Sequence, residues 1–177
     1  MVLANGSLSS QSGGEGAIRE NILKADLVEC IVAMPSQLFY STQIPVCLWF
    51  LNRDKKQPGK VLFIDARNMG NMVTRKLREL SEDDMMKIAG VYDKYVSGTL
   101  ENEKGFCAVV GMEEIAKQDY ILTPGRYVGI AETEDDGEPF QDKMERLTGE
   151  LSELFAKSHE LEDEIRKQLA SIGFTIK

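Results

Sequence analysis

Short apolar runs separated by polar turns mark the first two thirds of the chain. Val28 to Met34, Val46 to Leu51 and Val61 to Ile64 are nearly continuous in apolar residues. Each run is too short for a helix of ordinary length, and Pro or Gly lies close to several of their ends, which is typical of strands buried on both faces. Phe106 to Val110 is a further short apolar run, and Met1 to Ala4 is typical of the end of a buried strand.

Helical spacing appears between these runs. Apolar residues follow Glu15 at Ala17, Ile18, Ile22 and Leu23, a spacing that predicts an amphipathic helix. Ser81, followed by three acidic residues, predicts the start of a second helix, because Ser is a good N-cap and acids stabilise a first turn. A brief helix is expected over 112–118. The alternation of strands and helices predicts an α/β fold.

The last segment has the clearest period in the chain. Between Phe140 and Ile172, apolar residues recur every three or four positions, as in a heptad seam. A helix over these residues would be roughly 50 Å long. Its stripe therefore packs either on a helical partner or back on the domain. The residues expected at a partner interface are Leu147, Leu151, Leu154, Leu161 and Ile165.

Composition restricts the possible classes of protein. The 177 residues are 42% hydrophobic, which is enough for a core. The sequence contains no apolar run of the roughly 18 residues that a membrane span needs, and no secretory signal. Its three cysteines, Cys30, Cys47 and Cys107, have no pairing pattern, which favours free thiols in a reducing compartment. We therefore expect a cytoplasmic protein without a membrane segment.

The charge is unevenly distributed. The net charge is −8, yet Arg53 to Arg78 contains eight basic and two acidic residues. An acidic chain is a poor DNA binder by itself, because non-specific affinity comes from neutralising phosphates. The basic segment either touches a nucleic-acid backbone locally or is an ordinary solvated face.

Few constellations for catalysis are present. The single histidine, His159, lies outside the predicted seam, so neither a zinc site nor a Ser–His–Asp set can be assembled. The loop Ser12 to Gly16 is rich in Gly but lacks the Lys of a phosphate-binding loop. Asp65 ends a predicted strand, where an acid can bind ribose or metal, cap a helix or form a salt bridge.

The loop from Pro35 to Gln43 carries an aromatic pair, Phe39 and Tyr40, between two predicted strands. Such a pair either plugs the edge of the sheet or faces a cleft at the strand ends. In the second case it could hold a nucleobase, since enzymes that modify a base take it out of the stack and hold it against aromatic rings.

Several segments resemble the N6-adenine DNA methyltransferases, and more narrowly the modification subunits of type I restriction–modification systems. They are Val2–Leu8, Gly14–Arg19, Ile31–Phe39, Ile44–Leu51, Phe63–Arg67, Gly105–Cys107 and Leu122–Gly129, the last reading LTPGRYVG. The sequence departs from the family in having no Gly-rich S-adenosylmethionine motif and no Asn-Pro-Pro-Phe. We therefore expect a carboxy-terminal portion of such a subunit.

The resemblance implies a fold and an organisation. The fold would be α/β, a partial mixed sheet from the carboxy-terminal part of an S-adenosylmethionine-dependent methyltransferase, followed by a helical extension. Residues 1–67 would belong to the methyltransferase domain, 68–130 to a mixed helical region, and 131–177 to an acidic linker, Glu132 to Pro139, and the long helix.

It also implies a function. In the complete enzyme a methyl group passes from S-adenosylmethionine to N6 of a flipped adenine, on which Phe39 stacks, with the nearby Tyr40 as the alternative stacking residue. This chain alone would hold neither catalytic nor cofactor-binding residues and would be inactive. The alternative is a non-catalytic interaction module.

The partners that it implies are the DNA-specificity subunit, which would dock on the long helix, and the restriction subunit, with DNA bound through the complex. Self-association through an unpaired sheet edge or through the long helix is also expected.

Overall fold

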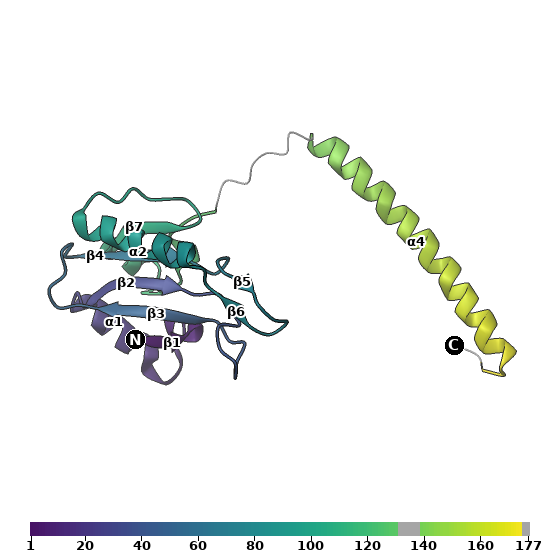
Figure 1. Cartoon of the computed structure of the whole chain (residues 1–177), viewed down its shortest axis with the longest axis horizontal. Helices are drawn as coiled ribbons and strands as arrows, with labels where there is room; N and C mark the ends of the chain where they lie inside the picture. Colours follow the sequence, from purple (N-terminus) through teal and green to yellow (C-terminus); the bar gives the residue numbers. More distant parts are fainter. Residues whose placement is uncertain (131–138, 175–177) are drawn as a thin grey trace. The chain divides into compact units, whose positions relative to one another are not determined.

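The computed structural model describes residues 1–130 and 139–174. The chain divides into two compact units, Met1–Glu132 and Thr133–Lys177 (Figure 1). Most of the segment expected as an acidic linker, Glu132 to Pro139, lies outside the described residues.

The first unit is built on a mixed five-stranded sheet with the order β1-β3-β2-β4-β7. The parallel neighbours are β2 and β4, and the other three pairs are antiparallel. This agrees with the expected α/β class and its mixed sheet. β7 comes from the region 68–130, so that region completes the same sheet. The strands are β1 (Val2–Ala4), β2 (Val28–Ala33), β3 (Val46–Leu51), β4 (Lys60–Asp65) and β7 (Cys107–Gly111).

Three α-helices and a small hairpin complete this unit. The helices are α1 (Glu15–Lys24), α2 (Glu82–Ser97) and α3 (Met112–Lys117). The hairpin is formed by β5 (Asn71–Met72) and β6 (Arg78–Glu79), and the 3-10 turns are η1 (Asn5–Leu8), η2 (Ser12–Gly14) and η3 (Pro124–Arg126).

The second helix begins at the expected signal. The Ser81 hydroxyl accepts a hydrogen bond from the Asp84 N–H at 3.1 Å, and the Asp84 carboxylate accepts one from the Ser81 N–H at 2.9 Å. These two bonds form a capping box. The hydrogen bonds from Ser81 lower the pKa of Asp84.

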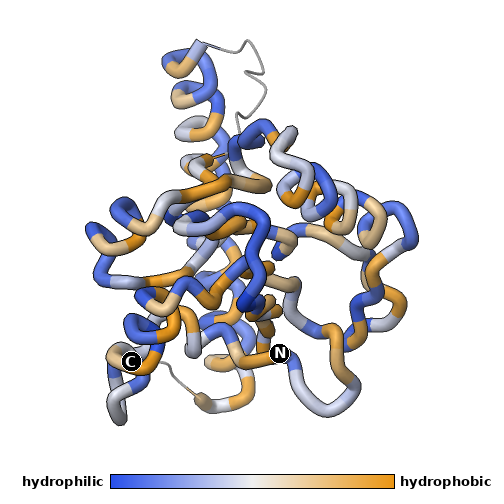
Figure 2. The backbone as a smooth tube through the Cα atoms, turned by 90° about the vertical axis from the view of Figure 1, so that its left-hand side faces the viewer, coloured by the Kyte–Doolittle hydropathy of each residue, from blue (hydrophilic) through white to orange (hydrophobic). Residues whose placement is uncertain are grey.

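The core has two layers because side chains alternate across the sheet. Val61 and Phe63 of β4 face one cluster, which Leu23 of α1 and Ile115 of α3 also enter. Leu62 and Ile64 face the other, with Val91 and Tyr95 of α2. In Figure 2, hydrophobic stretches run through the crossing segments at the centre of the view. As predicted, β2 and β4 are therefore buried on both faces.

Two further strands, β3 and β1, are less buried than expected. In β3 only Cys47 and Trp49 are buried, and Phe50 is 41% exposed. The expectation of burial on both faces was wrong for β3, because its second face borders an open cavity of about 410 Å³ beside α2. β1 is an edge strand whose outer side has no neighbour among the described residues, so Val2 is 58% exposed.

A buried arginine ties distant segments together. Arg19 of α1 is 2% exposed. Its Nε donates to the Tyr120 carbonyl at 2.7 Å, and its Nη1 donates to the carbonyls of Ser10 at 2.9 Å and Ser7 at 3.3 Å. Burial lowers the pKa of Arg19. The guanidinium thus joins α1 to the loop before it and to the turn after α3.

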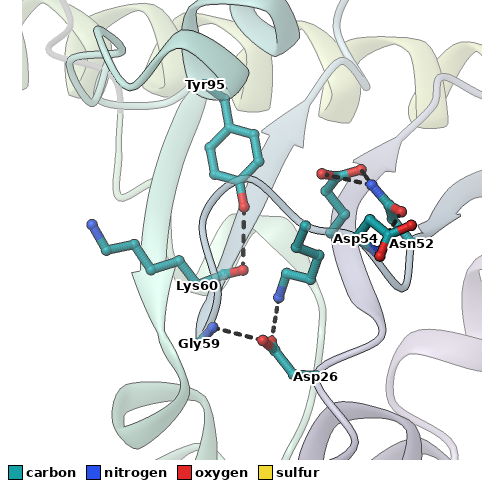
Figure 3. A network of polar contacts seen from close by, with 8 residues as sticks. Asp26, Asn52, Asp54, Gly59, Lys60 and Tyr95 are labelled. Atoms are coloured by element: carbon teal, nitrogen blue, oxygen red, sulfur yellow. Dashed lines mark hydrogen bonds and ion pairs between the residues drawn. The ribbon is translucent and has the colours of Figure 1, made fainter.

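A polar network holds the loop between β3 and β4 (Figure 3). The Asp26 carboxylate pairs with Lys55 and accepts the Gly59 N–H at 2.9 Å. The Tyr95 hydroxyl donates to the Lys60 carbonyl at 3.2 Å, which connects α2 to the start of β4.

A buried carboxylate supports the same end of the sheet. Glu29 is 3% exposed and accepts hydrogen bonds from the Asn52 amide at 3.2 and 3.3 Å and from the Tyr92 hydroxyl at 2.9 Å. Buried charges of this kind are tolerated when hydrogen bonds satisfy them.

The second unit contains one long helix, α4 (Phe140–Ser171), with no buried residue. Hydrophobic and hydrophilic residues alternate along its sequence. Over the described ranges, 1–130 and 139–174, no helix is long and apolar enough to cross a membrane.

Replacing Arg19 with Met should lower the free energy of unfolding by about 2–4 kcal/mol, because charge-assisted hydrogen bonds are lost and partly buried carbonyls are left unpaired. Urea denaturation followed by circular dichroism measures the change. The exposed Arg53→Met is the control and should change stability by no more than about 0.5 kcal/mol. Equal stability of the two variants would show that Arg19 does not organise the fold.

Candidate functional site

The loops that carry the candidate binding side chains lie together at the carboxyl edge of the sheet, where the parallel strands β2 and β4 end. Because β2 and β4 are parallel and Ala33 pairs with Asp65, the loops that follow both strands leave from the same edge. Figure 1 shows the β5–β6 hairpin beyond the arrowhead of β2. Ligands of α/β sheets commonly bind at the carboxyl ends of parallel strands, which makes this edge the candidate site.

The loop after β2 presents the predicted aromatic pair. Leu38 packs against the core and anchors the loop. Phe39 and Thr42 form an isolated antiparallel bridge around a tight turn that carries Tyr40. Phe39 is 42% exposed and Tyr40 93% exposed. Within this unit neither ring is a buried plug, and both are available to a ligand.

Asp65 ends β4 in a bidentate ion pair. Arg67 Nη2 lies 2.6 Å from Asp65 Oδ2, and Arg67 Nε donates to Asp65 Oδ1 at 2.8 Å. The carboxylate raises the pKa of Arg67. Among the roles that the sequence left open for Asp65, the structure therefore shows salt bridging.

The LTPGRYVG segment passes directly over this ion pair. A Cβ atom at Gly125 would lie 2.9 Å from Arg67 Nη2, so a side chain there would force the arginine to move. Tyr127 stacks on Phe63 with ring centroids 4.2 Å apart, which seats the segment on the core. The burial of its ring raises the pKa of Tyr127 to about 12.

The β5–β6 hairpin is hydrogen-bonded to the aromatic loop. The sequence did not predict this contact. The Arg78 N–H donates to the Gln37 carbonyl at 2.8 Å. The predicted basic segment is thereby divided. Arg53 and Lys56 lie in the loop before β4, at the opposite edge, whereas Arg75 and Lys76 lie in the hairpin at the candidate site.

The remaining candidates from the sequence do not join this edge as reactive groups. All three cysteines are free and buried, and burial raises the pKa of the Cys30 and Cys107 thiols, so they are poor nucleophiles. His159 is exposed on α4. Within residues 1–130 and 139–174, no three potential metal ligands come together.

Comparison with known proteins agrees with this architecture. Residues 1–136 match the family N-6 DNA Methylase. The type I restriction enzyme HindI methylase subunit of Haemophilus influenzae is 55% identical over 98% of this chain and 40% of its own length. The MjaIX methylase subunit of Methanocaldococcus jannaschii is 43% identical over 98% of this chain and 32% of its own length.

A solved structure supports the relationship. The methyltransferase subunit of the type I restriction–modification system from Streptococcus thermophilus superposes with a TM-score of 0.62 at 27% identity, covering 73% of this chain and 26% of that one. The chain thus spans two fifths or less of the length of these relatives. By its sequence match over residues 1–136 and by its fold, the chain belongs to the N-6 DNA methylase family.

Proposed function

We propose that this chain is the target-base portion of a type I restriction–modification DNA adenine-N6 methyltransferase. In the complete enzyme, Phe39 stacks on an adenine flipped out of the duplex, and Tyr40 is its neighbour. The observation that carries this proposal is the anchored but exposed aromatic turn beside the carboxyl ends of β2 and β4. Exposed rings on a fixed loop suit base stacking, which needs one open face of the ring.

The chemistry of methyl transfer belongs to S-adenosylmethionine in the complete enzyme. The cavity beside α2 does not fit this cofactor, because its lining side chains, such as Val32, Leu48 and Met85, are almost all apolar. The amino and carboxylate groups of S-adenosylmethionine would need polar partners there. We therefore assign no cofactor-binding residue to this chain and expect it to be inactive alone.

The role of this portion is to hold the base. Phe39 and Tyr40 would offer apolar area and π-stacking to the extruded adenine, which offsets part of the cost of unstacking it. The loop is held by Leu38 in the core and by the Arg78–Gln37 hydrogen bond, so its position is set before the base arrives.

The second unit is proposed to dock partners. Along α4, the seam residues are between 43% and 64% exposed, and they form an apolar stripe that no described residue of the same unit covers. A DNA-specificity subunit is the proposed occupant, with the restriction subunit joining the same complex. These seam residues are Leu147, Leu151, Leu154, Leu161 and Ile165.

A non-catalytic interaction module is the second candidate function, and the same stripe favours it. Self-association would use either α4 or the open edge of β1. The three free, buried cysteines are consistent with a cytoplasmic location for either function.

Replacing Phe39 with Ala in a complete methylase subunit that contains this sequence should lower kcat/KM for DNA methylation about 10- to 100-fold, since base–aromatic stacking contributes about 1–3 kcal/mol. Tritium transfer from labelled S-adenosylmethionine measures the rate. Phe39→Trp should retain activity, and Ile44→Ala, an exposed apolar change in the same loop, is the control. Undiminished methylation by Phe39→Ala would rule out the stacking role.

The isolated chain should bind no S-adenosylmethionine in isothermal calorimetry, because its sequence holds no Gly-rich S-adenosylmethionine motif and the lining of the cavity beside α2 is almost all apolar. The complete subunit is the positive control in the same buffer. Clear micromolar binding by the isolated chain would contradict its assignment as the target-base portion alone.

Replacing Leu151, Leu154 and Leu161 with Asp should abolish co-purification with the specificity subunit, because charges would enter an apolar interface. The matched control changes Ser152, Ala156 and His159 to Asp, which adds the same charge to exposed positions outside the seam. Docking through α4 is excluded if both triple variants co-purify equally well.

A further inference from the structure

The β5–β6 hairpin is a rigid platform for the charges at its tip. The Arg78 guanidinium donates from Nη1 to the carbonyls of Met69 at 3.0 Å and Gly70 at 2.9 Å, which closes its base. Gly70 has φ +80°, and a Cβ atom there would lie 2.7 Å from the Glu79 carbonyl oxygen, so the close approach requires glycine. Leu77 is 8% exposed and seats the hairpin on the domain.

The turn of the hairpin is equally well defined. The Val73 N–H donates to the Leu77 carbonyl at 2.9 Å. The Thr74 hydroxyl accepts the N–H groups of Lys76 at 3.2 Å and Leu77 at 3.0 Å. The side chains of Arg75 and Lys76 therefore project from a turn with a fixed backbone.

Several cations of the chain are neutralised by a nearby carboxylate, but within the described ranges the two at the tip of this hairpin are not. Lys24, Lys55, Arg67 and Lys87 each lie within 4 Å of a carboxylate. Arg75 and Lys76 are exposed and form no ion pair with any residue of the described ranges. Two adjacent uncompensated cations in a chain of net charge −8 leave a local positive potential that is suited to an anion.

The hairpin also has a fixed relation to the aromatic loop. The Arg78 N–H donates to the Gln37 carbonyl. Gln37 is two residues before Phe39 in the aromatic loop, and Arg78 is two residues after Lys76 in the hairpin. If a nucleotide stacked on the aromatic turn, the sugar–phosphate backbone on either side of it would therefore lie near Arg75 and Lys76. Arg pairs with phosphate in a bidentate manner and Lys acts as a point charge, which together fit successive phosphates.

We propose that the β5–β6 hairpin is a DNA-backbone clamp, in which Arg75 and Lys76 bind phosphates of the strand that carries the base held by Phe39 and Tyr40. This inference rests on the proposed function and adds to it the residues that hold the strand. Contacts of this kind carry affinity and position rather than sequence information. They account for a basic hairpin in an acidic chain.

The test uses a complete methylase subunit that contains this sequence, together with its specificity subunit, and a short dye-labelled duplex in which a central 2-aminopurine faces an abasic site. Fluorescence anisotropy is measured over a series of KCl concentrations. In Arg75→Gln/Lys76→Gln the slope of log K against log[KCl] should fall by about 1.4–1.8, because each lost phosphate contact removes about 0.7–0.9. Affinity at low salt should fall about tenfold or more.

The control is Arg53→Gln/Lys56→Gln, which removes the same two charges from exposed positions at the opposite edge of the sheet. It should leave the slope close to that of the wild-type complex. The clamp is overturned by equal losses in the two double variants, or by an unchanged slope in the hairpin variant.

A second measurement tests base stacking separately from the phosphate contacts of the clamp. 2-Aminopurine fluorescence in the same titration reports stacking on Phe39 and Tyr40, and Phe39→Ala/Tyr40→Ala should abolish its change while keeping the salt slope. If only that fluorescence change fails to appear, the stacking function is wrong and the clamp stands. If the hairpin variant instead keeps the DNA slope but loses co-purification of the specificity subunit, the hairpin contacts protein and the clamp is wrong.

Discussion

The parallel pairing of β2 with β4 is the constraint on which the candidate site depends. In this register Ala33 lies opposite Asp65, so the chain leaves both strands at one edge. A shift by one residue would turn Val32 and Ile64 to the opposite layer of the core and would be strongly disfavoured. The aromatic turn, the Asp65–Arg67 ion pair and the hairpin are therefore brought to one edge by the burial of side chains that take no part in the chemistry.

The polar groups at the opposite edge of the sheet, where β4 begins, stabilise the fold. There Asp26 and Glu29 accept hydrogen bonds from the loop that joins β3 to β4, and Tyr92 and Tyr95 of α2 enter the same network. Every group in this network is engaged in holding the chain, so its polarity is structural. The contrast matters because both edges carry basic side chains. At the edge with the aromatic turn, the unpaired Arg75 and Lys76 lie in a hairpin bonded to the loop of the exposed rings, beside the carboxyl ends of both parallel strands.

The sequence predicted those features that depend on neighbouring residues and missed those that depend on contacts between distant segments. The runs in β2 and β4 predicted buried strands because continuous apolar stretches record burial on two faces. Burial of β3 was overestimated, since exposure depends on whether a helix covers Phe50, which no local pattern encodes. Arg19 was missed because a charged residue in an amphipathic pattern is normally read as solvent-exposed, and its carbonyl partners include one 101 residues away. The basic segment was recognised as a unit, but only the topology divides it between two edges.

Electrostatics connects the acidic composition to the proposed work of the chain. A uniformly basic protein would bind DNA in many orientations, since phosphate contacts carry no register of their own. Here acidic residues predominate, and cations such as Lys55 and Arg67 are paired with carboxylates. At physiological salt a charge acts over about 8 Å, so the unpaired Arg75 and Lys76 act mainly on the strand next to them. Repulsion from the acidic remainder would disfavour other docking modes, and the hairpin would thereby orient the strand with its base toward Phe39.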